Sequence, residues 1–197
     1  MKIAFIYLAS GFAKRFGSNK LLVLWQGKPL YQAGFETLQK AKNELLAQGH
    51  DVKIIVTSQY AEILAWCQEH SAVAVENTHS LEGITASLKL GTRAAQDAQV
   101  LLFCAADQPF LQACTIVKLV AGYLQSGKKI GCVVNGTRQG NPTLFASVYS
   151  QELLELKGDK GGKVLLQRHP EDVFQLPVAA EELRDIDFPT DLTQVEK

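Results

Sequence analysis

The sequence lacks an excess of charge of either sign, because 20 lysines and arginines balance 20 aspartates and glutamates. No overall field would therefore draw the chain to nucleic acid or to an anionic membrane, and neither is expected as a partner. Long apolar runs are also missing, since nothing approaches the roughly 18 residues that suggest a membrane span. The first apolar run is too short for a secretory signal, and no small-residue cleavage site follows it. Any binding of anions must therefore depend on local clusters.

Paired cysteines are absent as well. The four cysteines, at positions 67, 104, 114 and 132, are scattered and form no C-x-x-C motif. This usage predicts a reduced protein of the cytoplasm. With 197 residues, 47% of them hydrophobic, the chain can bury a full core, and residues 1–197 are expected to form one domain.

Several familiar motifs are missing. The run from Gly11 to Lys20 has the wrong spacing for a G-x-x-x-x-G-K-[ST] phosphate loop, and no G-x-G-x-x-G fingerprint or H-E-x-x-H metal motif occurs. The G-x-S-x-G motif of α/β-hydrolases is absent, and the four histidines are not clustered. The sequence still allows nucleotide chemistry that uses a glycine-containing loop of a different type from these motifs.

Apolar runs typical of strands alternate with segments that have helical spacing. This alternation predicts a three-layer α/β domain with a mostly parallel sheet. A shorter strand at residues 141–145 is expected to be antiparallel. The expected strands are residues 3–8, 52–57, 72–75, 100–106, 130–134, 141–145, 173–176 and 185–187. The expected helices are residues 30–48, 61–70, a segment from about 84 to 98, 115–124, 148–156, 162–169 and a closing helix at Pro189.

The loop at residues 8–22 follows the first strand, where an α/β sheet is expected to bind a nucleotide. Glycines let backbone N–H groups approach an anion, and nearby cations supply charge. A solvated basic loop is the alternative. The loop contains Gly11, Lys14, Arg15, Gly17 and Lys20.

Acidic residues follow two other expected strands. Asp107 comes directly after the most continuous apolar run, where it can hold Mg²⁺ together with substrate phosphates, or cap the following helix. Asp185 and Asp187 would point to one face of a strand. For Asp187 a ligand role and an N-cap role before Pro189 are equally favoured, whereas for Asp185 a structural role is favoured.

Two further segments could hold parts of a substrate. Residues 83–87 open a helix whose N-terminus can bind a base or phosphate, or simply be an ordinary helix start. The glycine-rich segment 158–162, followed by Lys163 and Arg168, can hold a second anionic substrate or form a solvated turn.

The opening segment L-A-S-G-x-x-x-R-F-G-x-x-K-L-L resembles the signature of Rossmann-like nucleotidyltransferases, with Ser10 in place of the usual Ala or Gly. Four later segments resemble the molybdenum cofactor branch of that family. They are G-I-T-A-S-L at 83–88, A-D-Q-P-F at 106–110, G-N-P-T-L-F at 140–145 with G-D-K-G at 158–161, and D-I-D-x-P at 185–189. Guanylyltransferases of this branch carry G-P-L-A-G where residues 83–87 stand, and this departure favours cytosine.

The resemblance implies a molybdenum cofactor cytidylyltransferase that transfers CMP from CTP to molybdopterin. It implies catalytic roles for Arg15, Lys20 and Asp107, and Mg²⁺ binding by Asp107 and Asp187. It also suggests a molybdoenzyme or its chaperone as a partner. The implied nucleotide contacts are Leu8, Ala9, Ser10, Gly11, Arg15, Lys20, Thr85 and Ser87.

Two alternatives remain. One is a guanylyltransferase, or another nucleotidyltransferase with a different phosphate acceptor. The other is a non-catalytic protein that binds or delivers the cofactor, which should bind pterin without releasing pyrophosphate.

Overall fold

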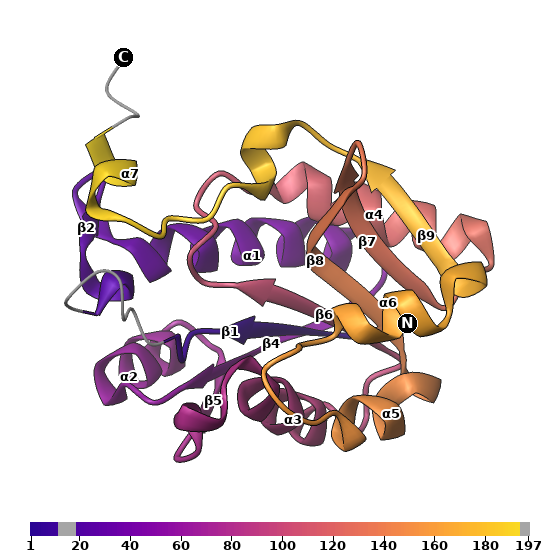
Figure 1. Ribbon diagram of the computed structural model, residues 1–197, viewed down its shortest axis with the longest axis horizontal. Helices are drawn as coiled ribbons and strands as arrows, with labels where there is room; N and C mark the ends of the chain where they lie inside the picture. The colour runs from indigo at the N-terminus through magenta and orange to yellow at the C-terminus, as the bar shows by residue number, and fades with distance from the viewer. Residues whose placement is uncertain (12–18, 194–197) are drawn as a thin grey trace.

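The computed structural model describes residues 1–11 and 19–193. Within these residues, seven strands form one sheet in the order β5-β4-β1-β6-β8-β7-β9, with helices on both faces (Figure 1). Strand β8 is antiparallel to both of its neighbours, and the other pairings are parallel. The predicted fold class is therefore confirmed. The strands are β1 (Lys2–Leu8), β4 (Asp51–Ser58), β5 (Val73–Glu76), β6 (Val100–Ala105), β7 (Ile130–Asn135), β8 (Arg138–Ala146) and β9 (Val173–Pro177).

The helices agree with most of the expected segments. None of them, within the part of the chain that the structure describes, is long and apolar enough to cross a membrane. They are α1 (Leu30–Ala47), α2 (Ala61–Glu69), α3 (Ile84–Ala94), α4 (Ala113–Ser126), α5 (Ser150–Glu155), α6 (Lys163–Arg168) and α7 (Pro189–Thr193).

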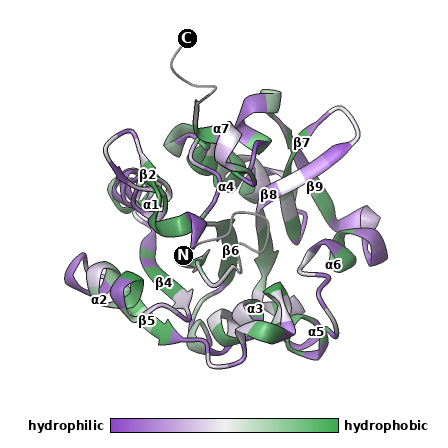
Figure 2. Cartoon of the chain, turned by 60° about the vertical axis from the view of Figure 1, so that its left-hand side comes forward, coloured by the Kyte–Doolittle hydropathy of each residue, from purple (hydrophilic) through white to green (hydrophobic). Residues whose placement is uncertain are grey.

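The alternating side chains of β1 supply both halves of the core. Ile3, Phe5 and Tyr7 pack in a cluster with side chains of α1, α2 and α4. Their neighbours Ala4, Ile6 and Leu8 pack in a second cluster with side chains of α3, α5 and α6. A strand places successive side chains on opposite faces, so a strand covered on both sides must be apolar throughout. Figure 2 accordingly shows a hydrophobic colour along the inner strands and both colours on the helices.

Three expected elements differ from the prediction. The strand expected to be short, at residues 141–145, is β8, which spans nine residues. Residues 185–187 are not a strand, because the backbone bond from Ile186 N–H to the Asp107 carbonyl (2.9 Å) is not extended into a ladder. Helix α3 ends at Ala94 rather than Ala98. There the N–H of Ala98 bonds to the Ala95 carbonyl (2.9 Å), which closes a turn instead of another helical repeat.

A two-stranded hairpin was not predicted from the sequence. Strands β2 (Leu24–Trp25) and β3 (Lys28–Pro29) are joined by Gln26 and Gly27, whose φ angles are both positive, as a tight hairpin turn requires. Trp25 packs with Leu30 and Ile186 in a small cluster beside the main core. Trp25 of the hairpin thus lies between the start of α1 and the segment that contains Ile186.

All four cysteines are unpaired, as the scattered spacing predicts. Cys67, Cys104 and Cys132 are buried, and burial raises the pKa of Cys67 to about 12 and that of Cys132 to about 11. These thiols therefore behave as small apolar core groups.

Candidate active site

A cavity of about 350 Å³ lies where β1 and β6 end, at the carboxyl edge of the sheet. Several predicted residues line it, although they come from segments far apart in the sequence. Arg15 and the rest of 12–18 lie outside the described residues, so their predicted roles stay predictions. The lining residues are Leu8, Ser10, Gly11, Lys20, Leu21, Ser80, Leu81, Gly83, Ile84, Ser87, Ala105, Ala106, Asp107 and Asp159.

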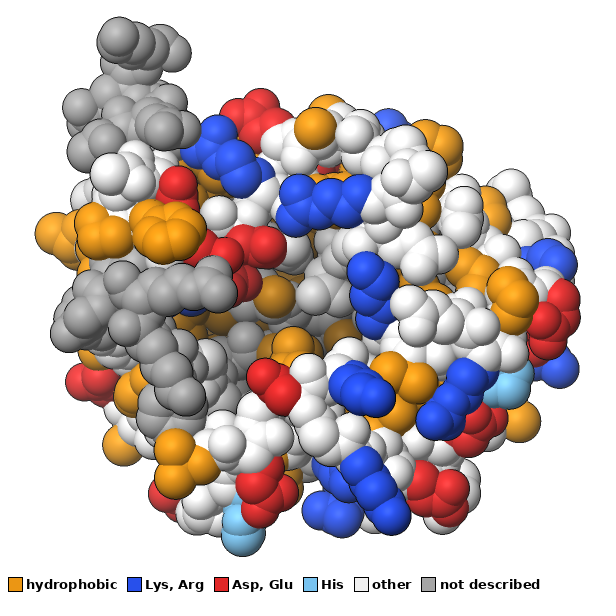
Figure 3. Space-filling model, viewed as in Figure 1, with side chains coloured by type: hydrophobic (Ala, Val, Ile, Leu, Met, Phe, Trp, Pro, Cys, Tyr) orange, Lys and Arg blue, Asp and Glu red, His pale blue; other side chains and the backbone are white. Residues whose placement is uncertain are grey.

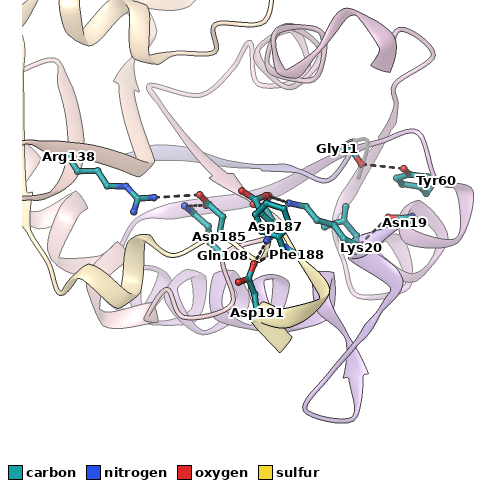
Figure 4. A network of polar contacts seen from close by, with 12 residues as sticks. Gly11, Asn19, Lys20, Tyr60, Gln108, Arg138, Asp185, Asp187, Phe188 and Asp191 are labelled. Atoms are coloured by element: carbon teal, nitrogen blue, oxygen red, sulfur yellow. Dashed lines mark hydrogen bonds and ion pairs between the residues drawn. The ribbon is translucent and has the colours of Figure 1, made fainter. Parts of the chain in front are cut away.

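Lys20 joins the two acidic residues that were predicted as metal ligands. Its ammonium donates to Asp107 Oδ2 at 2.7 Å and to Asp187 Oδ1 at 2.9 Å. The Lys20 side chain is 9% exposed, against 25% for Asp107 and 47% for Asp187. Figure 4 shows the Lys20 side chain pointing toward Asp187. The structure therefore brings three predicted residues to one point.

Local structure sets the direction of Lys20. A short 3₁₀ helix spans Lys20–Leu22, and the Asn19 side chain caps it by accepting from the Leu21 N–H at 3.1 Å. Burial alone would lower the pKa of Lys20, but Asp107 and Asp187 outweigh it and raise that pKa above its ordinary value. The ammonium is therefore held charged.

Asp185 belongs to a different network, although it is only two residues from Asp187. Its Oδ1 accepts from the Gln108 amide at 2.7 Å, and Arg138 lies 3.6 Å from its Oδ2 (Figure 4). Burial, followed by the nearby charge of Asp107, raises the pKa of Asp185. These contacts fit the structural role that the sequence favoured.

The backbone after β1 is fixed by contacts with β4 and the residues that follow it. Ala9 donates its N–H to the Thr57 carbonyl at 2.9 Å, and its own carbonyl accepts from the Ser58 hydroxyl at 2.7 Å. The next carbonyl, of Ser10, accepts from the Gln59 amide at 2.8 Å. Leu8, Ser10 and Gly11 line the cavity, whereas Ala9 is buried behind them. Sequence reasoning did not identify these supporting groups, because nothing in their spacing indicates the contact.

Helix α3 separates the two hydroxyl residues predicted to contact a nucleotide. Ser87 lines the cavity, and its Oγ accepts from the Asn77 amide at 2.8 Å. Thr85 instead lines a different surface cavity, beside Lys89 and Lys157. Residues two apart on a helix do not face the same side, which explains the separation.

Asp159 is a cavity residue whose contact the sequence does not reveal. Its Oδ1 accepts the N–H of Ile84 at 2.7 Å, at the N-terminus of α3. The glycine-rich segment 158–162 indicated a loop, but not that this loop would reach a helix 75 residues earlier.

The two carboxylates of Asp107 and Asp187 fit a divalent cation. One oxygen from each already lies within hydrogen-bonding distance of a single cationic nitrogen. Mg²⁺ commonly takes one or two carboxylates and completes its shell with phosphates and water. No group of three or more His, Cys, Asp or Glu suited to a metal occurs among residues 1–11 and 19–193, so a protein-only cage is not formed there.

Three solved structures share the fold of this chain at low sequence identity. Rv0371c of Mycobacterium tuberculosis, in complex with manganese, has a TM-score of 0.71 at 21% identity, covering 90% of this chain and 89% of that one. Molybdopterin-guanine dinucleotide biosynthesis protein A of Archaeoglobus fulgidus has a TM-score of 0.70 at 18% identity, covering 98% and 95%. A CMP:2-keto-3-deoxy-manno-octonic acid synthetase complexed with CTP has a TM-score of 0.73 at 13% identity, covering 99% and 97%.

A comparison by sequence defines the family. No curated protein matches the chain. The model of the MobA-like NTP transferase domain, however, matches residues 5–173, which include the second half of β1, Lys20 and Asp107. The chain therefore belongs to the MobA-like NTP transferase family and is a nucleotidyltransferase.

Proposed function

We propose that this nucleotidyltransferase transfers CMP from CTP to the molybdenum cofactor, giving molybdopterin cytosine dinucleotide and pyrophosphate. The observation that carries the proposal is the convergence of Lys20, Asp107 and Asp187 beside the cavity at the ends of β1 and β6. An ammonium that can neutralise phosphate and two carboxylates that can hold a divalent ion are the groups that nucleotidyl transfer needs. We also propose that residues 1–197 form one domain.

In the proposed reaction, a terminal phosphate oxygen of the acceptor bonds to the α-phosphorus of CTP. The bond from that phosphorus to the pyrophosphate oxygen breaks, and pyrophosphate leaves. The attacking phosphate is already ionised at neutral pH, so no side chain has to remove a proton. The chain therefore contributes mainly positioning and charge neutralisation.

Lys20 and the backbone at Ser10 and Gly11 are proposed to hold the triphosphate. This role is supported by their shared place in the cavity wall and by the charge of Lys20. Arg15, which lies outside the described residues, is assigned the same role from the opening motif alone.

Asp107 and Asp187 are proposed to hold Mg²⁺, which when bound would neutralise charge on the reacting phosphates. The manganese in the Rv0371c complex supports a divalent ion in a protein of this fold. The partial burial of Asp107 strengthens its attraction for a cation, because fewer water dipoles screen it.

CTP is preferred to GTP because residues 83–87 depart from the guanylyltransferase pattern. Ser87 and Leu8 line the cavity and are proposed to contact the base or ribose. Thr85, which lines the neighbouring surface cavity, is left out of this proposed set.

Pyrophosphate release tests the proposal directly. The purified chain is mixed with Mg²⁺, molybdenum cofactor and, in separate reactions, CTP, GTP, ATP or UTP. We expect release only with CTP and only when the cofactor is present. Release with GTP would indicate the guanylyltransferase alternative, and cofactor binding without any release would indicate a delivery protein. The Asp107→Asn variant serves as the control for contaminating activity.

We also propose a cytoplasmic location, supported by the four unpaired cysteines. A molybdoenzyme or its chaperone is proposed as the partner that receives the product. Co-purification with tagged molybdoenzymes tests that partner.

A further inference from the structure

A separate cavity, here called the outer cavity, lies between α3 and the segment that follows α5. Its volume is about 400 Å³, and Thr85, Lys89 and Lys157 line it. Among the described residues, none lines both this cavity and the one that contains Lys20, so the proposed reaction gives it no role. Figure 3 shows the hollow of the active-site face, with Lys and Arg side chains gathered toward the side formed by α3 and α5.

The hydroxyl of Thr85 is buried at the outer cavity without a partner. Thr85 is 4% exposed, and its Oγ1 makes no hydrogen bond to any other described residue. Thr92, in the same helix, donates its hydroxyl to the Leu88 carbonyl at 2.8 Å, which is a common solution for a threonine inside a helix. Because buried hydroxyl groups nearly always have a partner, the unpartnered Oγ1 indicates a ligand at this cavity.

The charged side chains around Thr85 favour an anion. Lys89 lies four residues after Thr85 and therefore shares its face of α3. Lys157 reaches the same cavity from the segment after α5. The one acidic residue among the described lining residues is Glu82, whose exposed side chain lies with Oε1 3.2 Å from His79 Nδ1. Two lysines and one carboxylate leave the cavity with a net positive charge.

The shape and polarity of the outer cavity narrow the class of anion. Ala86 and Leu156 are buried residues that line it, so part of its wall is apolar. A phosphate group offers several acceptor oxygens, which match one hydroxyl donor and two ammonium groups, and it carries more charge than a carboxylate. A volume of about 400 Å³ also leaves room for a small organic group on the phosphate.

We propose that the outer cavity binds the phosphate group of a small molecule, at a site distinct from the reaction centre. The Thr85 hydroxyl donates to a phosphate oxygen, and the ammonium groups of Lys89 and Lys157 neutralise its charge. The bound phosphate joins α3 to the segment after α5. Inorganic phosphate and phosphate monoesters both carry this group, and binding experiments distinguish them.

The outer cavity shares a structural support with the active site. Gly158 lines the outer cavity, and the next residue, Asp159, lines the cavity that contains Lys20. Asp159 Oδ1 accepts the Ile84 N–H at 2.7 Å, which ties this segment to α3. A phosphate that bridges the same two elements from the outer cavity adds a second tie. The ligand is therefore expected to stabilise one wall of the active site.

Binding is measured by NMR titration of the isotope-labelled chain. Inorganic phosphate and glycerol phosphate are added in separate titrations at constant ionic strength, because salt screens exposed lysines. We expect saturable shifts in the amide signals of Thr85, Ala86 and Gly158. Saturation with either compound supports the site, and the tighter of the two identifies the source of the phosphate group. The absence of saturation with both compounds overturns the proposal.

The charged groups are tested with the compound that binds more tightly. Lys89→Gln and Lys157→Gln are each expected to raise its dissociation constant about tenfold, because each removes a charged partner of the phosphate. Arg93→Gln is the matched control and should change that constant less than about twofold, because Arg93 is an exposed cation of the same helix outside the cavity. Glu82→Gln is expected to strengthen binding, because it removes a like charge. Equal effects of Arg93→Gln and Lys89→Gln, or weaker binding by Glu82→Gln, overturn the proposal.

The hydroxyl is tested with two variants at Thr85. Thr85→Val keeps the shape and removes the hydroxyl, so it should weaken phosphate binding about threefold. In buffer without phosphate it should unfold at the same temperature as the wild type or at a higher one, because no hydrogen bond is lost. Thr85→Ser keeps the hydroxyl and should bind as the wild type does. A lower unfolding temperature of Thr85→Val without phosphate, or binding equal to that of the wild type, overturns the proposed contact.

Discussion

Asp185 and Asp187 stand on either side of Ile186, yet their side chains have different partners. Asp187 accepts from the ammonium of Lys20, and nearly half of its side chain is exposed. Asp185 accepts from the Gln108 amide and lies near Arg138, and its pKa is raised by burial. One carboxylate thus pairs with a cation that lines the cavity at the ends of β1 and β6, and the other ties its own segment to the residue after Asp107. Sequence proximity alone does not assign a function to a carboxylate.

The largest loss is expected at Asp107, which shares Lys20 with Asp187. Asp107→Asn keeps the shape but removes the charge, and we expect kcat to fall about 10³-fold. Circular dichroism and thermal unfolding should show a folded protein. Near-normal pyrophosphate release with normal Mg²⁺ dependence would falsify its role as a ligand.

The next largest loss is expected at Lys20. Lys20→Ala leaves the largely buried carboxylate of Asp107 without its cation, and kcat/KM for CTP should fall about 10²-fold. Lys28→Ala is a suitable control, because Lys28 pairs with Glu36 beside a different cavity. Unchanged CTP kinetics in Lys20→Ala would refute contact with the triphosphate.

A smaller loss is expected at Asp187. Its side chain is more exposed than that of Asp107, so water weakens its electrostatic interactions, and Asp187→Asn should lower kcat about tenfold. The Mg²⁺ concentration that gives half-maximal activity should rise. A loss of kcat as large as that of Asp107→Asn would show that the exposed fraction of each side chain does not determine how much it contributes to catalysis.

The smallest effect is expected at Asp185. An asparagine there can still accept from Gln108 and loses only the longer contact with Arg138, so the free energy of unfolding should change by less than about 1 kcal/mol. Activity should stay close to that of the wild type. A loss matching that of Asp187→Asn would remove the distinction between the two side chains.

The predicted parts of the molecule are those that depend on short-range patterns. Continuous apolar runs predicted β1 and β6, because a strand covered on both faces has no polar side. The sequence also predicts that Lys20, Asp107 and Asp187 lie close together, because each follows a strand or precedes a helix. The sequence could not reveal the bond from Ile84 to Asp159, because a tertiary contact across 75 residues leaves no local pattern.

Two segments are arranged differently from what their local patterns suggest. The sequence groups Thr85 and Ser87 as hydroxyl residues at a helix start, but helical geometry places them beside different cavities. Residues 185–187 have the alternation of a strand, but Ile186 is buried with Trp25 beside a hairpin too short to predict. The conformation of residues 185–187 therefore depends on which neighbour packs against them.

The Lys20 ammonium already lies between the two carboxylates that are proposed to hold a metal ion. Its position affects how a metal ion and a nucleotide could enter the site. The three groups together carry one net negative charge rather than two, so a divalent ion entering between the carboxylates must exchange with an internal counter-ion. Such an ion and the ammonium repel each other strongly at contact distance, so the ammonium needs another anion to receive it. The triphosphate of an incoming nucleotide is such an anion. If the carboxylates hold the metal as proposed, we therefore expect metal and nucleotide to strengthen each other's binding.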